Sequence, residues 1–341
     1  MTSVTSRRSF NKGLFLAGAA VAAPAVYPRP LRAAEFSYKY ANNSPASWPM
    51  NTRAVEYAEK IKQETNGQLE ITVFPNNQLG SDSDMLSQLR SGGIEFFTLS
   101  GVILSTLVPV ASISGVGFAF KDYNQVWGAM DGEVGNLVRA QIAKVGLVAM
   151  DKMLDNGYRH ITTSTAPVRT PADIKGVKIR VQISPLSMSV FKSFGASPTG
   201  INWSEVYSSL QTKIVDGQEN PLSIIEAAKI YEVQKYCSLT GHVWDGFHFL
   251  ANKRHWEALP EPVREIARKN LNAMAMAQRA DMLVANEAAR ATLEKNGLVF
   301  NDVDREEFRA VLRKSGFYSE WQERYGKEAW AALERNSGAL G

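Results

Sequence analysis

Residues 69–100 read LEITVFPNNQLGSDSDMLSQLRSGGIEFFTLS and decide the fold class. Both ends of this stretch are apolar runs of strand length, and between them Met85, Leu86 and Leu89 recur at helical spacing. A polar turn precedes the helix and a pair of glycines ends it. The stretch predicts strand, helix, strand, which is the repeating unit of an α/β domain with a largely parallel sheet.

The same alternation continues on both sides of this stretch. A strand is expected at residues 36–41, followed by a helix with four apolar residues on one stripe: Ala54, Val55, Ala58 and Ile61. After Gly146 the rhythm restarts with residues 147–152, 157–163 and 171–182, which predict a second α/β unit. The length agrees with this division, because 341 residues correspond to about two domains.

One long helix is expected near the carboxyl end, at residues 260–296. At about 1.5 Å per residue it reaches ~50 Å, more than the width of one domain, so it should cross from one lobe to the other. In open α/β sheets ligands bind beyond the carboxyl ends of strands. The expected architecture is therefore α/β with two lobes, a ligand cleft between them and a long helix that spans both.

The first 34 residues carry an export signature. A twin-arginine run, SRRSFNK, occupies residues 6–12, and the mildly apolar GLFLAGAAVAAPA follows at residues 13–25. The apolar run spans only about 20 Å as a helix, short of the ~30 Å hydrocarbon core of a bilayer. Residues 1–34 are therefore predicted to be a Tat-type signal peptide rather than a membrane anchor, and the exported protein is expected in the periplasm.

The formal charge of +4 belongs to this leader. Its five basic residues have no acidic counterpart, whereas residues 35–341 carry 33 basic and 34 acidic residues. No basic stripe with interleaved aromatics occurs there, which argues against a nucleic-acid partner. Nothing after the leader approaches the 18 apolar residues of a membrane helix, so the exported protein is not expected to be embedded in a membrane. A single cysteine and four histidines favour neither a disulfide nor a zinc site.

Five pieces of residues 170–236 recur in a known family. They are TPADIKGVKIR, FGASPT, WSEVYSSLQ, VDGQENP and YEVQKY. In this order and at near-fixed spacing, they resemble the solute-binding subunits of tripartite ATP-independent periplasmic (TRAP) transporters, the DctP-type family. The similarity extends over essentially all of residues 35–340.

The resemblance implies a periplasmic binding protein fold and a function without catalysis or cofactor. Such a protein closes around a small organic acid anion and delivers it to the TRAP membrane permease subunits; it is expected to be a monomer. Lobe I is expected to comprise residues 35–157 plus about 246–285, and lobe II residues 158–245 plus about 286–341. A sugar acid, a hydroxy acid and an aromatic acid all remain open as ligands.

Three residues are implied to bind the carboxylate. Arg180 matches the family's principal carboxylate-binding arginine, Arg159 a second arginine that often faces the ligand, and Asn220 the asparagine that hydrogen-bonds the same carboxylate. A guanidinium suits this task because it forms two parallel bonds to a carboxylate. Local sequence alone is equally consistent with an exposed strand residue at Arg180, a loop residue at Arg159 and a helix N-cap at Asn220.

Five further residues are candidates for the wall of the site. Trp203 matches a position where the family places an aromatic ring against the ligand, although a core tryptophan is the alternative. Asn43 and Ser100 match loop positions that close over the body of the ligand. Trp244 and Asp245 lie in GHVWDGFHF, residues 241–249, where the chain is expected to return to the first lobe; a hinge or a pocket wall is the other interpretation.

Two other chemistries and one other role were weighed. A metal site would use His242, Asp245 and His248, but in an extended segment residue 245 points away from the other two, so no metal is predicted. A thiol-dependent hydrolase would use Cys237 with His242 as base, although no oxyanion or orienting motif accompanies them. A subunit that reports ligand occupancy to a membrane receptor would share the same fold and cleft.

Overall fold

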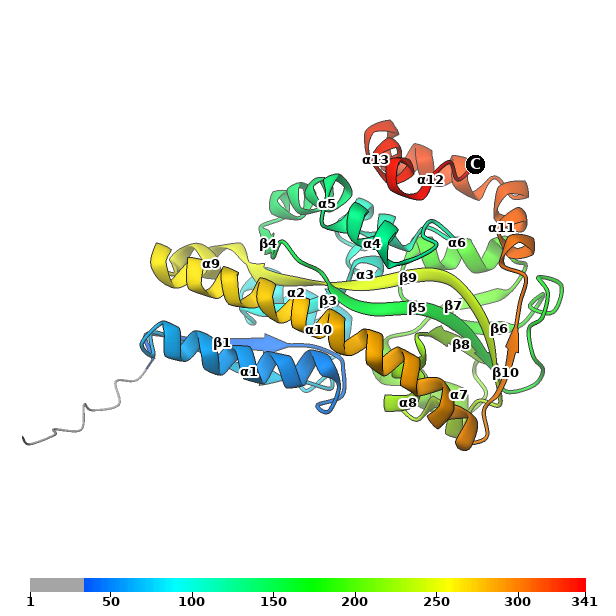
Figure 1. Ribbon diagram of the computed structural model, residues 1–341, viewed down its shortest axis with the longest axis horizontal. Helices are drawn as coiled ribbons and strands as arrows, with labels where there is room; N and C mark the ends of the chain where they lie inside the picture. Colours follow the sequence, from blue (N-terminus) through cyan, green and yellow to red (C-terminus); the bar gives the residue numbers. More distant parts are fainter. Residues whose placement is uncertain (1–33) are drawn as a thin grey trace, which may run out of the picture. The chain divides into compact units, whose positions relative to one another are not determined.

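The computed structural model describes residues 34–341, whose strands form one mixed sheet (Figure 1). The strands are β1 (Phe36–Ala41), β2 (Leu69–Phe74), β3 (Phe96–Ser100), β4 (Leu147–Ala149), β5 (Leu154–Thr163), β6 (Lys178–Val181), β7 (Ser197–Gly200), β8 (Gly217–Asn220), β9 (Tyr236–Asn252) and β10 (Val299–Asp302). Their order along the sheet is β2-β1-β3-β9-β5-β8-β6-β7, and β4 and β10 also pair with β9. The predicted signal peptide, apart from Ala34, lies outside the described residues.

Helices cover the sheet and connect its strands (Figure 1). The α-helices are α1 (Pro49–Glu64), α2 (Asp82–Ser91), α3 (Gly101–Leu104), α4 (Tyr123–Met130), α5 (Glu133–Lys144), α6 (Pro185–Ser193), α7 (Val206–Gln211), α8 (Leu222–Ala227), α9 (Lys253–Ala258), α10 (Glu261–Lys295), α11 (Arg305–Lys314), α12 (Phe317–Tyr325) and α13 (Lys327–Ser337). Three short 3₁₀ helices are η1 (Pro109–Gly115), η2 (Trp203–Glu205) and η3 (Ile230–Glu232).

The strand-helix-strand prediction for residues 69–100 is confirmed by β2, α2 and β3. β1 lies between β2 and β3 and is parallel to both. On α1, however, the predicted apolar stripe is wrong at Val55, whose side chain is 59% exposed while Ala54 and Ile61 are buried. The reason is geometric, because successive residues of a helix point about 100° apart and Val55 is displaced from the buried face by that rotation.

Two long antiparallel strands, β5 and β9, join the two halves of the sheet. The first part of β9 pairs with β5, from Tyr236 opposite Thr163 to Phe247 opposite Leu154. Its last part, residues 247–251, pairs with β3. The prediction that a second α/β unit begins at residue 147 is wrong, because β4 pairs with the same end of β9 as β3 does. The second half begins with β5.

β5 is irregular along its pairing with β9. The register shifts twice, between Asp155 and Gly157 and again between Arg159 and Ile161. Gly157 has φ +118°, a conformation in which any side chain would be strained, and a Cβ there would also press against Asn286. Such bulges bend a strand and re-aim its side chains, and they are common next to functional sites.

Helix α10 confirms the predicted long helix almost to the residue. It contacts α1 and β5 along its first half and middle and α8 toward its other end, so it bridges both halves of the sheet (Figure 1). Gln278 of α10 is fully buried; its Nε2 donates to the backbone oxygen of Asp155 over 2.7 Å, and its Oε1 accepts from the Asp155 backbone N–H over 2.9 Å. Gln278 thus anchors α10 to β5 through both backbone polar groups of one residue.

Gln278→Met should lower the free energy of unfolding by about 2 kcal/mol. Methionine is similar in size but leaves the N–H and C=O of Asp155 buried without partners, and each unsatisfied buried group costs roughly 1–3 kcal/mol. Urea denaturation measures the difference. Gln141→Met is the matched control, because Gln141 is exposed on α5 and should tolerate the same change within about 0.5 kcal/mol. Equal stabilities of the two variants would contradict the bridging role of Gln278.

The environment of Cys237 excludes the thiol-dependent hydrolase. Cys237 is fully buried in an apolar cluster with Leu210 and Leu293, and burial raises the pKa of its thiol. A protonated thiol without solvent access cannot act as a nucleophile, so the structure contradicts the thiol-dependent hydrolase.

Among the helices of residues 34–341, none combines the length and the apolar character needed to cross a bilayer.

Candidate ligand-binding site

A small polar cavity lies where the two halves of the sheet meet. Its walls come from β5, β6, β8, β9, α3, α8, η2 and the segment after β1. The lining residues are Asn43, Ile103, Asn156, Arg159, Arg180, Gln182, Trp203, Asn220, Ile224 and Phe247. The part of the cavity that the centre of a water molecule can occupy has a volume of only about 30 Å³. Because one water needs roughly 10–15 Å³ by this measure, the cavity in this arrangement has room for only a few water molecules, and its walls must separate for an organic acid to enter before they close around it.

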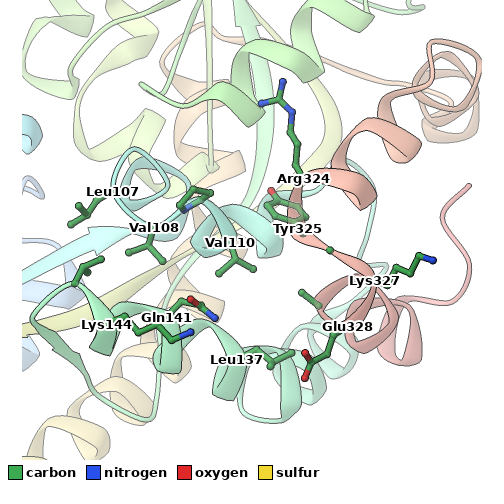
Figure 2. A pocket seen from close by; sticks show the side chains of 14 residues that line it. Leu107, Val108, Val110, Leu137, Gln141, Lys144, Arg324, Tyr325, Lys327 and Glu328 are labelled. Carbon is green, nitrogen blue, oxygen red and sulfur yellow. The ribbon is translucent and has the colours of Figure 1, made fainter.

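A larger hollow of about 480 Å³ lies elsewhere, between η1, α5 and the turn from α12 to α13 (Figure 2). Its floor is apolar, with Leu107, Val110 and Leu137, whereas its three basic residues are exposed: Lys144, Arg324 and Lys327. No buried charged or polar side chains converge there, in contrast to the small cavity. Recognition of a small polar ligand needs a few precisely placed polar groups, which favours the small cavity as the site.

Arg180 is a buried cation without an anionic partner. It is 2% exposed, and its Nε and Nη2 both donate to the carbonyl oxygen of Ile201 at 2.9 and 2.8 Å. Within residues 34–341 no carboxylate forms an ion pair with it, and its Nη1 donates no hydrogen bond. Burial lowers the pKa of its guanidinium to about 10. An isolated buried charge is costly, so the site gains free energy when an anion binds Arg180.

Arg159, in contrast, is already paired. It is 1% exposed; its Nε and Nη2 donate to the carboxylate of Glu219, and its Nη1 donates to Oδ2 of Asp245 at 3.0 Å. Burial would raise the pKa of Glu219, but the charge of Arg159, its hydrogen bonds and the nearby His242 ring outweigh it and lower that pKa to about 2. Arg159 therefore lines the cavity with its positive charge already offset by two buried carboxylates.

Three of the predicted site residues do not line the cavity. Asp245 is fully buried and accepts four hydrogen bonds, from Ser100, Asn156, Arg159 and Gln182. Ser100 donates to Asp245 over 2.7 Å and is buried as well. Trp244 donates from Nε1 to Asp155 at 2.9 Å, and its ring lies among aromatic side chains of the core. The structure therefore brings together Arg180, Arg159, Asn220, Trp203 and Asn43, with Ser100, Trp244 and Asp245 behind the wall.

Asn220 and Trp203 flank Arg180 in the cavity. The Trp203 ring lies 5.8 Å from the Arg180 guanidinium carbon, close enough for a cation-π contact, and packs beside the cores of both halves. Asn220 is the last residue of β8, and its Nδ2 donates to Oε1 of Gln218. The N-cap position of α8 is occupied by Pro221. The interpretation of Asn220 as a helix cap is therefore wrong.

Asn43 connects the cavity to a buried carboxyl group. Its Nδ2 donates to both oxygens of Asp82, at 2.9 and 3.1 Å, and Asp82 is 1% exposed at the start of α2. Burial raises the pKa of Asp82 to about 6, although the hydrogen bond from Asn43 and the charge of Arg180 lower it in part. Asp82 therefore changes charge close to neutral pH within the field of Arg180.

Anion binding at Arg180 should strengthen as pH falls from 7.5 to 5, by roughly 3- to 10-fold. Above its pKa of about 6, Asp82 is negative and competes electrostatically with a bound carboxylate; below it, Asp82 is neutral. Glu219, with a pKa of about 2, and His160, with a pKa of about 3, do not titrate in this window. Calorimetry at both pH values measures the effect. In Asp82→Asn the dependence should vanish, and its persistence there would assign it to Asp155, whose pKa is also about 6.

The histidines near the site do not form a metal centre. His242 is fully buried, with Nδ1 2.7 Å from Oγ1 of Thr240 and Nε2 3.4 Å from Oε2 of Glu219. Both ring nitrogens of His248 are buried without a hydrogen-bond partner in the described part of the chain. Across residues 34–341, no three side chains of the types His, Cys, Asp and Glu are grouped closely enough to hold a metal ion.

Five lining residues were missed by the analysis of the sequence: Ile103, Asn156, Gln182, Ile224 and Phe247. Gln182 carried a signal, because it lies two residues after Arg180 and strand residues two apart share a face. Asn156 lies at the first register shift of β5, and that bulge follows from the pairing with β9. The apolar members had no signal beyond their hydrophobicity.

Known proteins resemble this chain over most of its length. The model of the family described as bacterial extracellular solute-binding protein, family 7 (DctP), matches residues 40–321. The 2,3-diketo-L-gulonate-binding periplasmic protein YiaO of Escherichia coli is 32% identical over 308 residues, which cover 89% of this chain and 91% of that protein.

Two solved structures share the fold. Both are TRAP periplasmic solute-binding proteins. The protein from Polaromonas, bound to D-erythronate, is 28% identical with a TM-score of 0.84, covering 88% of this chain and 98% of that one. The protein from Sulfurospirillum deleyianum, with bound succinate, is 27% identical with a TM-score of 0.83, covering 89% and 99%.

These similarities agree with the mixed α/β fold and its long bridging helix. The family consists of transporter subunits without enzymatic activity, which accords with the buried thiol of Cys237. The chain therefore belongs to the DctP family of periplasmic solute-binding proteins, the solute-binding subunits of TRAP transporters.

Proposed function

We propose that this protein captures a small organic carboxylate in the cavity around Arg180 and delivers it to the membrane permease subunits of a TRAP transporter. The observation that carries the proposal is the buried, unpaired guanidinium of Arg180. Its free Nη1 is available to a carboxylate, and charge-assisted bonds of this kind are about twice as strong as neutral ones. Asn220, Trp203, Asn43 and Arg159 complete the contact surface.

The printed ligands of the relatives support the chemical class. The Escherichia coli relative binds 2,3-diketo-L-gulonate, and the two solved structures hold D-erythronate and succinate. All three are organic acids. In this proposal Ser100, Trp244 and Asp245 support the cavity from behind, and the permease contact follows from membership of the family.

A screen of organic acids by thermal shift tests the proposal. Any ligand that binds only the folded protein stabilises it, by about 2.7 kcal/mol at 100 times its dissociation constant. The panel contains sugar acids, hydroxy acids, keto acids, dicarboxylates and aromatic acids, with the corresponding neutral polyols as controls. At least one acid should raise the melting temperature while its neutral analogue does not. A panel in which no acid stabilises the protein contradicts the proposed function.

Ligand binding should also be accompanied by closure of two lobes. We place lobe I at residues 35–157 plus about 246–285 and lobe II at residues 158–245 plus about 286–341. Asn43 then lies on one lobe and Arg180 and Asn220 on the other, so all contacts form only when the lobes meet. Small-angle X-ray scattering should give a smaller radius of gyration with a tight ligand than without it. An unchanged radius would contradict closure and leave binding itself untouched.

A further inference from the structure

The polar groups of the cavity wall indicate which functional groups the ligand carries besides one carboxylate. Two arginines, Arg159 and Arg180, lie in the cavity wall. Within residues 34–341, Arg180 is the one whose guanidinium has no carboxylate partner. Arg159 already holds Glu219 and Asp245, and those two acids are fixed in place. One ligand carboxylate neutralises Arg180. A second one would find no free cation in the wall.

Asp245 determines how two amide side chains of the wall are oriented. It accepts from Nδ2 of Asn156 at 3.0 Å and from Nε2 of Gln182 at 3.1 Å. A carboxylate only accepts hydrogen bonds, so the amide groups that face it must be the NH₂ groups. Ser100 reinforces this orientation, because its Oγ donates to Asp245 and accepts from Gln182.

The carbonyl oxygens of the same two amides have no hydrogen-bond donor among the described residues. Oδ1 of Asn156 is buried without a hydrogen-bond partner, and Oε1 of Gln182 accepts no hydrogen bond from the described residues. Both side chains line the cavity, and both residues are at least 95% buried. A buried acceptor without a partner is unfavourable, so Oδ1 of Asn156 favours a ligand that brings a donor, and Oε1 of Gln182 is a second free acceptor on the cavity wall.

We infer that the site is built for a monocarboxylate that carries hydroxyl groups, and that it discriminates against dicarboxylates. This inference rests on the proposed function. Arg180 takes the carboxylate, and the carbonyl oxygens of Asn156 and Gln182 accept from ligand hydroxyls. Asp245 is a positioning residue, since it acts on the ligand only through the two amides. Among the acids left open by the sequence, the aromatic acids without hydroxyl groups are excluded.

The discrimination follows from hydrogen-bond chemistry. A hydroxyl donates to a carbonyl oxygen, whereas an ionised carboxylate has no proton to donate and is repelled by it. A methylene group leaves the carbonyl oxygens buried and unpaired, which a site designed for hydroxyls penalises strongly. The orientation set by Asp245 also prevents the amides from turning to offer NH₂ groups, because that would place their oxygens against its carboxylate.

Isothermal titration calorimetry with matched pairs of acids tests the inference. D-erythronate and succinate are both four-carbon acids, one with hydroxyls and one with a second carboxylate; gluconate and adipate form the six-carbon pair. In at least one pair the hydroxy acid should bind at least tenfold more tightly than the dicarboxylate. Comparable or tighter binding of the dicarboxylate overturns the inference but leaves the proposed function intact. If no monocarboxylate, dicarboxylate or other acid of the wider panel binds, both fall.

Gln182→Met tests the mechanism with a side chain of similar size. It removes the carbonyl acceptor and should weaken the hydroxy acid about tenfold, while leaving any measurable affinity for the dicarboxylate within threefold. The matched control is Gln141→Met in the distant hollow (Figure 2), which should change neither affinity. Circular dichroism establishes that the variants are folded. An unchanged affinity of Gln182→Met for the hydroxy acid overturns the role of this carbonyl.

Asp245→Asn addresses the positioning role. An asparagine can offer NH₂ to the two amides, which lets them turn, so the ratio of hydroxy-acid to dicarboxylate affinity should fall at least tenfold. A residue with only a structural role would lower both affinities and leave the ratio unchanged, and that result overturns the assignment. If this variant does not fold, the ligand pairs and Gln182→Met decide the inference.

Discussion

Arg180→Lys should weaken binding of the cognate acid by about 2–4 kcal/mol, which corresponds to a loss of roughly 30- to 1,000-fold. Lysine keeps the positive charge but not the planar fork that donates two parallel hydrogen bonds to a carboxylate. It also loses the two bonds by which Arg180 holds the carbonyl oxygen of Ile201. Calorimetry with the tightest acid of the screen measures the change.

Arg169→Lys is the control for this substitution. Arg169 is exposed on the segment before β6, so the same chemical change should leave the affinity unaltered. An affinity of Arg180→Lys within threefold of the unaltered protein would show that Arg180 is not the residue that takes the carboxylate. The proposed function would then lose the observation that carries it.

Arg159→Gln should destabilise the folded protein by about 3–5 kcal/mol, independently of any ligand. The change leaves the carboxylates of Glu219 and Asp245 buried without their cation, and breaking a buried ion pair from one side costs about this much. Urea denaturation of the ligand-free protein measures the loss. The expectation separates a role in holding the wall together from direct binding of the acid.

Arg53→Gln provides the comparison. Arg53 also pairs with two carboxylates, Asp281 and Glu56, but all three side chains are partly exposed, so its loss should cost less than about 1 kcal/mol. If Arg159→Gln proved as stable as Arg53→Gln while failing to bind ligand, Arg159 would be a direct ligand contact. The network around Glu219 would then contribute little to folding.

The regular elements could be predicted from the sequence, whereas their pairing could not. β2, α2, β3 and α10 follow from apolar periodicity and from glycine and proline at their ends, which are local signals. The continuous pairing of β9 with both β5 and β3 brings together segments far apart in the chain. No local pattern encodes that pairing, and the apparent start of a second unit at residue 147 was misleading for this reason.

For the candidate site, too, some residues could be identified from sequence motifs, whereas the placement of others depends on the pairing of the strands. Arg180, Asn220 and Trp203 were identified through the resemblance, and the structure brings them to one cavity. Asp245 was predicted beside the ligand, but the register of β9 places it behind Asn156 and Gln182. Whether a polar side chain contacts the ligand or its neighbours depends on bulges and register, which are properties of the whole sheet.

The strand β9 has a consequence for how such proteins can diversify. It supplies hydrogen bonds to β5 over one part of its length and to β3 over the other. A half produced alone would end in an unpaired strand edge, and exposed edges lead to aggregation. An exchange of one half between related genes therefore has to preserve the pairing of β9 with both neighbouring strands. Point substitutions in the cavity wall leave this pairing intact and are the simplest route to a new specificity.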